Sequence, residues 1–236
     1  MEVEIWSDIV CPWCYIGKRR FERALASFEH AASVTVCYRS FELDPAAPAA
    51  RSGSHAEHLA RKYGMPVAQA EQMDQQMTER AAAEGLDFRF DTMRGGNTFD
   101  AHRLLHLARE RGLQAEMKER LMRATFTDGL PIADKATLAD LAAEVGLAGD
   151  DARAALEQDT YAAAVRGDEE QASRYGITGV PFYVADGKFA VSGAQPTEVF
   201  EQLLRRAYQE SNPLTLVTSD EGDGAASCDG DSCAIL

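Results

Sequence analysis

Two cysteines near the start of the chain, Cys11 and Cys14, have the spacing of a redox-active pair. Residues 2–6 alternate polar and apolar side chains as a strand does, and a helical pattern begins at Pro12. Cys11 is therefore expected at a helix N-terminus, where free backbone N–H groups and the helix dipole stabilise a thiolate. Cys14 follows one turn later, within reach of a disulfide bond. The pattern predicts thiol–disulfide exchange, with Cys11 as the more exposed attacking sulfur and Cys14 as the buried resolving one.

Two other chemistries remain open for this motif, a structural disulfide and half of a zinc site. Pro12 suits the first turn of a helix, because the N–H that proline lacks would have no partner there. The proline inside the motif and the change from strand to helix favour redox exchange over both alternatives.

The elements around the pair predict a small α/β domain that is split by helices. A β-branched and aromatic strand is expected at 33–41, so the chain opens as a parallel β–α–β unit. After 179–181, a hairpin around the Asp-Gly turn at 186–187 and a closing helix from 196 to about 210 complete this domain. Between these parts the pattern is helical, at 54–63, 66–84, 97–111, 114–126, 134–145 and 150–175, the last interrupted near Gly167.

Composition excludes several classes of partner. The formal net charge is −14, from 38 acidic and 24 basic residues, and such a surface repels the phosphate backbone of nucleic acid. The chain has no apolar run long enough to cross a membrane. Its first residues lack the basic and apolar regions of a secretory signal, so a cytoplasmic location is expected.

Three segments resemble motifs of the DsbA-like thioredoxin-fold oxidoreductases, and among these the FrnE-like cytosolic branch. They are residues 7–17 (SDIVCPWCYIG), 179–181 (GVP) and 192–196 (SGAQP), and the resemblance extends over about residues 1–211. It implies an α/β thioredoxin fold with a large all-α insertion. The expected parts are a thioredoxin domain at 1–48 and 168–211, a helical insertion at 49–167, and a flexible acidic tail at 212–236.

The resemblance also assigns residues to the site. It implies a cis Val180–Pro181 bond packed against the cysteine pair, with the Val180 backbone free to pair with an extended peptide. It further implies that a helix containing His102 overhangs the active site, so a position near Cys11 and a plain surface or core position are both open for this histidine.

The expected activity is that of a protein thiol–disulfide oxidoreductase without a cofactor, acting on protein or small-molecule disulfides and thiols. Trp13, between the two cysteines, cannot supply the positive charge that a histidine can, which favours a reductase or isomerase over a strong oxidant. Glutathione-dependent transferases of the kappa type and hydroxychromene-carboxylate isomerases are the rival enzymes, with glutathione as partner, but they act through a single Ser or Cys. A redox-regulated chaperone is the non-enzymatic rival.

Other cysteines and histidines give weaker indications. Cys37 is expected to be a buried strand residue. His102 and His106 have the spacing of two zinc ligands on one helical face, but lack an obvious third ligand, so no metal is expected. His55 and His58 are expected in solvent.

The tail contains a second pair, Cys228 and Cys233, among acidic residues that disfavour a thiolate. The FrnE-like resemblance favours an auxiliary redox pair that exchanges with the first pair. An idle pair and a metal site shared by the four thiols are the alternatives.

Overall fold

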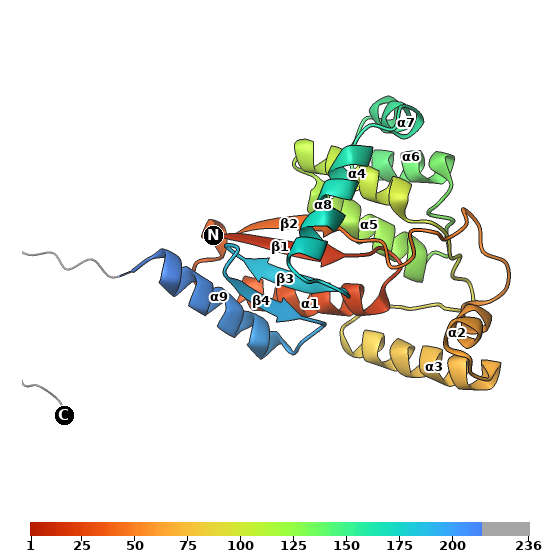
Figure 1. The fold of residues 1–236 in the computed structure, drawn as a ribbon, viewed down its shortest axis with the longest axis horizontal. Helices are drawn as coiled ribbons and strands as arrows, with labels where there is room; N and C mark the ends of the chain where they lie inside the picture. Colours follow the sequence, from red (N-terminus) through yellow and green to blue (C-terminus); the bar gives the residue numbers. More distant parts are fainter. Residues whose placement is uncertain (214–236) are drawn as a thin grey trace, which may run out of the picture.

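The structure, a computed structural model, describes residues 1–213. A four-stranded sheet lies between helical layers, and a block of helices is inserted between its second and third strands (Figure 1). None of the helices in this part of the chain is long and apolar enough to cross a membrane. The elements are β1 (Glu2–Ser7), α1 (Pro12–Ala26), a short 3₁₀ turn (Ala31–Ser33), β2 (Thr35–Ser40), α2 (His55–Tyr63), α3 (Val67–Ala83), α4 (Phe99–Glu110), α5 (Gln114–Phe126), α6 (Lys135–Glu144), α7 (Gly149–Glu157), α8 (Ala162–Arg174), β3 (Phe182–Ala185), β4 (Phe189–Ser192) and α9 (Thr197–Ser211).

The strand order is β2-β1-β3-β4. β1 pairs in parallel with β2, and β3 runs antiparallel to both β1 and β4. The parallel pair requires a crossover, which α1 provides, whereas β3 and β4 are joined by the predicted hairpin at Asp186 and Gly187. The sequence-predicted order of β–α–β, helices, hairpin and closing helix is confirmed.

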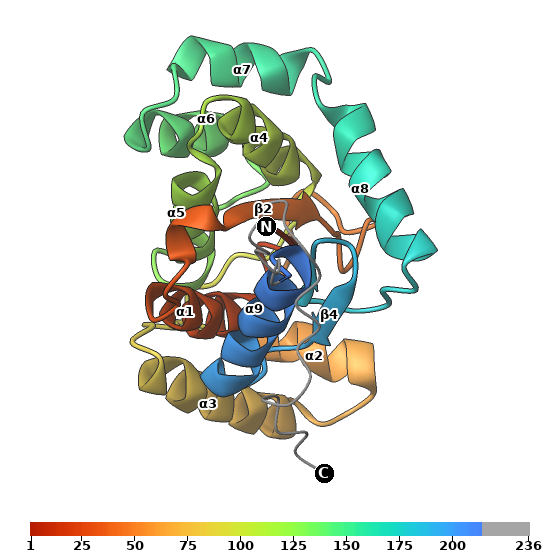
Figure 2. The same cartoon turned by 90° about the vertical axis from the view of Figure 1, so that its left-hand side faces the viewer.

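Side chains of the central strand β1 alternate between the two helical layers. Val3 and Ile5 join Phe21 of α1 and Phe200 of α9 in one apolar cluster. Trp6 points to the opposite face, where its Nε1 donates a hydrogen bond to a backbone carbonyl of α8 at 2.9 Å. Figure 2 shows α1 and α9 side by side beneath the sheet. The strand that leads to Cys11 is thus fixed from both faces.

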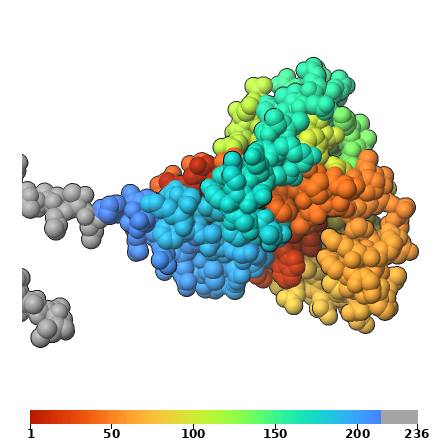
Figure 3. Space-filling view, viewed as in Figure 1, coloured from red at the N-terminus to blue at the C-terminus, as the bar shows by residue number. Residues whose placement is uncertain are grey.

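The inserted helices form two groups. Helices α4 to α7 enclose an apolar core of their own, which includes Leu104, Leu121, Leu138 and Leu156 and extends to Ile9, just before Cys11. Helices α2 and α3 pack against each other and form a separate lobe, orange to yellow in Figure 3. Both groups therefore come close to the cysteine pair, from different sides.

The helix expected over 150–175 is two helices, and the interruption lies at 158–161 instead of near Gly167. α8 continues through Gly167, so the domain boundary expected after this residue falls inside a continuous helix. Asp168 explains the difference: its carboxylate accepts hydrogen bonds from Ser40 N at 2.8 Å and Arg39 Nη1 at 3.1 Å, both in β2. These contacts hold α8 against the sheet and outweigh the low helix propensity of glycine.

A carboxylate on α5 connects the insertion to the helix that carries the cysteines. Glu119 accepts hydrogen bonds from Tyr15 Oη and Lys18 Nζ, each at 2.6 Å, and from Arg19, all on α1. Burial opposes ionisation, but the hydrogen bonds from Arg19 and the charge of Lys18 lower the pKa of Glu119 to about 2. This cluster fixes α5 relative to α1.

We predict that Glu119→Gln lowers the free energy of unfolding by about 1–2 kcal/mol at neutral pH, because Lys18 and Arg19 lose their shared counter-charge. The folded-state pKa lies below the ordinary value of 4.5. The stabilisation is therefore present above about pH 4.5 and is lost as the pH falls towards about 2. Urea unfolding of both proteins across this range measures it. The control is Glu116→Gln, an exposed position on the same helix. The prediction is contradicted if the difference in unfolding free energy between the wild type and E119Q stays the same as the pH falls.

Candidate active site

The two cysteines lie where the sequence predicts them. Cys11 is the N-cap residue of α1, and Cys14, in the first turn, donates its backbone N–H to the Cys11 carbonyl at 3.0 Å. Both are thiols and both are buried, with 4% of Cys11 and 2% of Cys14 exposed. The predicted difference in exposure is therefore small, but Cys11 lines a surface cavity and Cys14 lies behind it. A substrate in the cavity meets Cys11 first.

The environment of Cys14 opposes loss of its proton. Burial raises the pKa of Cys14 well above its ordinary value, and the neighbouring Cys11 thiol raises it further. The positive charge of Lys118 and a hydrogen bond from the Asp8 backbone act in the opposite direction. Loss of the Cys14 proton is therefore opposed by burial and favoured by these two groups.

The loop before β3 packs directly against the pair. The Val180–Pro181 bond is cis, as the resemblance implies. Cys11 Sγ donates to the Val180 carbonyl at 3.7 Å, and Val180 packs in the same apolar cluster as both cysteines. Gly17 allows α1 to approach this loop, because a Cβ at that position would lie 3.1 Å from Pro181 Cγ.

A cavity of about 340 Å³ opens in front of Cys11. Trp13 and the hydrophobic side chains of α2 and α3 form much of its wall, and Trp13 remains 38% exposed at its edge. Its apolar lining residues are Val10, Pro12, Trp13, Leu43, Leu59, Tyr63, Met73, Met77, Phe90, Met93 and Val180. Such a lining suits an extended peptide or a small organic disulfide better than a highly charged ligand.

Charged groups at the cavity are largely paired with one another. Arg51 binds Asp44 at 2.5 Å and lies 2.8 Å from His58 Nε2. His55 Nδ1 lies 2.8 Å from Asp74 Oδ1. Burial, followed by the charge of Arg51, lowers the pKa of His58. The prediction that both histidines lie in solvent is wrong, because the loop after β2 and helix α2 fold back over the cysteines, a contact that no local pattern encodes.

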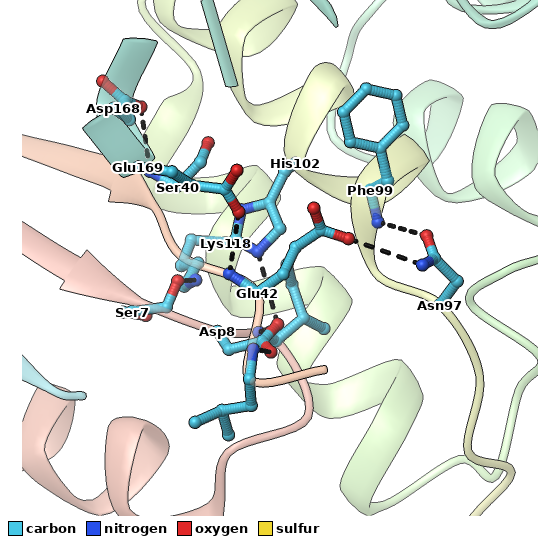
Figure 4. Close-up of polar contacts among 12 residues, drawn as sticks. Ser7, Asp8, Ser40, Glu42, Asn97, Phe99, His102, Lys118, Asp168 and Glu169 are labelled. Atoms are coloured by element: carbon cyan, nitrogen blue, oxygen red, sulfur yellow. Dashed lines mark hydrogen bonds and ion pairs between the residues drawn. The ribbon is translucent and has the colours of Figure 1, made fainter. Parts of the chain in front are cut away.

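His102 is brought near the site, but not into the cavity. It is completely buried on α4, with Nε2 3.3 Å from Asp8 Oδ1 (Figure 4). Burial opposes ionisation of Asp8, but the hydrogen bond and charge of His102 hold the pKa of Asp8 below its ordinary value. The histidine therefore acts on the residue that lies three positions before Cys11.

Two buried charged residues near the pair, Asp8 and Lys118, were not predicted from the sequence. Asp8 lies within the 7–17 motif, and its position just after a strand was the signal that could have found it. Lys118 lies on α5 and is completely buried, donating from Nζ to the Ser7 carbonyl at 3.2 Å. The residues around Lys118 in the sequence form no pattern that could have pointed to it.

The remaining candidates do not join the site. Cys37 is buried in β2, as predicted, and burial raises the pKa of its thiol. His106 Nε2 lies 3.1 Å from the carboxylate of Asp168, a residue of α8. Within residues 1–213 no three side chains of the His, Cys, Asp or Glu type are grouped so that they could hold a metal. Cys228 and Cys233 lie outside the described residues.

Comparison with known proteins identifies a family and several relatives. The model of the DSBA-like thioredoxin domain matches residues 2–205. A probable DsbA oxidoreductase from Streptomyces coelicolor has 45% sequence identity and a TM-score of 0.85, with 100% of this chain and 99% of that chain covered. The uncharacterized protein YwbO of Bacillus subtilis is 29% identical over 209 residues, 86% of this chain and 96% of that protein.

More distant structures share the fold. The cytosolic disulfide reductase DsbM from Pseudomonas aeruginosa is 19% identical with a TM-score of 0.62, covering 89% of this chain and 100% of its own. A 2-hydroxychromene-2-carboxylate isomerase is 12% identical with a TM-score of 0.66, covering 89% and 98%. The expected α/β thioredoxin-like fold with a helical insertion is confirmed.

We predict that Gly17→Ala destabilises the protein by about 1–3 kcal/mol, because the new methyl group would lie 2.6 Å from Tyr183 Oη and 3.1 Å from Pro181 Cγ. The control is Gly167→Ala in α8, where nothing lies within 4 Å, so alanine should stabilise the helix by about 0.5–1 kcal/mol. Urea unfolding measures both. Equal stabilisation by the two substitutions would mean that α1 does not pack this closely on the Pro181 loop.

Proposed function

Because the chain belongs to the DSBA-like thioredoxin domain family, we propose that it is a disulfide reductase or isomerase that works through Cys11 and Cys14. At the coarser level it is a DsbA-like thiol–disulfide oxidoreductase with a C-x-x-C pair. The observation that carries the proposal is the position of Cys11, at the N-terminus of α1, at the wall of the cavity and against the Val180 carbonyl. At this position one sulfur lines the cavity, and the second thiol, Cys14, follows in the first turn of α1.

The proposed reaction has two exchange steps. The Cys11 thiolate attacks a substrate disulfide, one substrate sulfur leaves as a thiolate, and the other stays bound to Cys11 Sγ as a mixed disulfide. Cys14 then attacks Cys11 Sγ, which forms the Cys11–Cys14 bond and releases the second substrate sulfur. Two electrons pass from the enzyme dithiol to the substrate disulfide. An external dithiol or glutathione returns the enzyme to its reduced form.

Substrate binding is proposed at the Val180–Pro181 loop and in the cavity beside it. Pro181 has no N–H, whereas the backbone of Val180 offers polar groups to an extended peptide, which favours recognition of a locally unfolded disulfide. The apolar wall supports binding of hydrophobic side chains next to that disulfide.

The reducing direction is supported by the dipeptide between the cysteines. Trp13 carries no charge, so α1 alone stabilises the attacking thiolate, as expected for a reductase or isomerase more than for a strong oxidant. The name of the Pseudomonas aeruginosa structure with the same fold, cytosolic disulfide reductase, agrees with this direction and with the cytoplasmic location that we propose. Membership of the FrnE-like branch is part of the same proposal.

Glutathione is the second candidate substrate. The cavity has the size of a small-molecule site, and another structure of the same fold is that of DsbM with GSH. In that case the enzyme would need only Cys11, because glutathione can resolve a mixed disulfide on its own.

We predict that the wild-type protein reduces insulin disulfides, that Cys11→Ser abolishes turnover, and that Cys14→Ser accumulates mixed disulfides visible by intact mass. The reason is that only the first cysteine attacks and only the second resolves. Addition of glutathione should rescue C14S only if glutathione is a substrate. Trapping by C11S, or equal trapping by both variants, would reverse the assignment, and a wild-type protein that binds insulin without reducing it would instead be a chaperone.

For the tail we propose, from sequence alone, that Cys228 and Cys233 exchange electrons with the first pair. We predict that the double substitution Cys228→Ser, Cys233→Ser lowers the multiple-turnover rate but leaves the first turnover unchanged, because a tethered dithiol reaches millimolar effective concentration. Truncation after Asn212 should have the same effect. Single- and multiple-turnover insulin reduction measure this, and equal turnover in all three proteins would mean that the tail pair is idle.

A further inference from the structure

Lys118 occupies an unusual position for a lysine. It is completely buried on α5, one turn before Met122, which packs in the same buried cluster as Cys11 and Cys14. In the described part of the chain its Nζ is held by the Ser7 carbonyl at 3.2 Å and by the Tyr38 ring, whose centre lies 5.8 Å away, and not by a carboxylate. A buried ammonium with so few partners is costly, so its presence calls for a compensating role.

The groups around Lys118 come from every element that packs against it. They are Asp8 after β1, Cys11, Cys14 and Lys18 of α1, Tyr38 of β2 and, through Asp8, His102 of α4. Burial lowers the pKa of Lys118 to about 8, and the negative form of Cys14 is the largest influence in the opposite direction. Conversely, the charge of Lys118 is the largest influence that lowers the pKa of Cys14. The positive charge of Lys118 and the negative form of Cys14 therefore favour each other.

Neither of the other nearby cations is placed to do the same. Lys18 binds Glu22 at 2.5 Å and Glu119 at 2.6 Å, so its charge is already compensated. His102 Nε2 lies 3.3 Å from the Asp8 carboxylate and is paired with that acid. The close-up in Figure 4 shows Lys118 beside Ser7 and Asp8, at the base of the active-site loop.

We propose that Lys118 is the counter-ion of the Cys14 thiolate and thereby a positioning residue for the resolving step. This inference rests on the proposed thiol–disulfide exchange at Cys11 and Cys14. Cys14 S–H gives up its proton, its sulfur electron pair forms the bond to Cys11 Sγ, and the bond from Cys11 to the substrate sulfur breaks. The departing sulfur takes the electron pair and then a proton, while the Lys118 ammonium balances the charge that Cys14 carries during the attack.

The test separates the two exchange steps by colour, with the disulfide of thionitrobenzoate as probe. Attack by Cys11 releases one thionitrobenzoate, and resolution by Cys14 releases the second in a later phase. In Lys118→Met we expect the first phase to be nearly unchanged. The pH midpoint of the second phase should rise by about one unit or more, because Cys14 then ionises without a counter-charge. Its rate at neutral pH should fall about three- to tenfold, because less of Cys14 is then ionised. The fall is limited because the more basic thiolate is the better nucleophile.

Methionine fills a similar volume without a buried charge, so the variant should fold, and Lys118→Gln is the second neutral variant. The matched control is Lys18→Met, which removes a lysine of similar burial on α1 and should leave the pH midpoint of the second phase in place. Unchanged second phases in both K118M and K118Q, or equal slowing of both phases without a pH shift, would overturn the role of Lys118. A wild-type protein that never releases the second thionitrobenzoate would instead refute the proposed exchange reaction.

Discussion

Burial of the cysteine pair is the constraint on which the rest of the site depends. A thiol that is shielded from water loses its proton only where the protein supplies opposite charge or N–H groups. Cys11 is the N-cap residue of α1, where the chain changes from β1 to a helix. Cys14 lies deeper, and burial raises its pKa well above the ordinary value. Cys11 therefore lines the cavity, whereas Cys14 does not.

The helical insertion places side chains on two sides of the Cys11–Cys14 pair. In front, α2 and α3 supply Leu59, Tyr63, Met73 and Met77 to the apolar wall of the cavity that Cys11 faces. Behind, α5 contributes two consecutive residues with opposite tasks. Glu119 binds three side chains of α1 and fixes the position of that helix, whereas Lys118 is completely buried and donates a hydrogen bond to the Ser7 carbonyl. A thioredoxin domain without the insertion would lack both the wall and the buried cation, so the insertion is part of the active site and not only a cover.

Hydrogen bonds to Asp8 link the loop before Cys11 to β2 and to the helical insertion. The carboxylate of Asp8 accepts the backbone N–H groups of Ile9 at 2.7 Å and Leu43 at 2.8 Å, which fixes the loop before Cys11 to the segment after β2. His102 of α4 approaches the same carboxylate. Strand, insertion and active-site loop thus meet at one buried acid, whose ionised form is favoured by His102 and by the Leu43 N–H even though burial opposes it.

The sequence by itself determined the features that depend on neighbours along the chain. The cysteine spacing, the strand-to-helix change at Pro12 and the hairpin at 186–187 predicted the fold order and the reacting pair, because turn residues and periodicity act over a few positions. Tertiary structure alone decided what surrounds the pair. The continuity of α8 through Gly167, the return of His55 to the cavity and the burial of Lys118 all arise from contacts between residues distant in sequence. A lysine in an amphipathic helix looks like a surface residue until the packing of α5 on the sheet shows that it is completely buried.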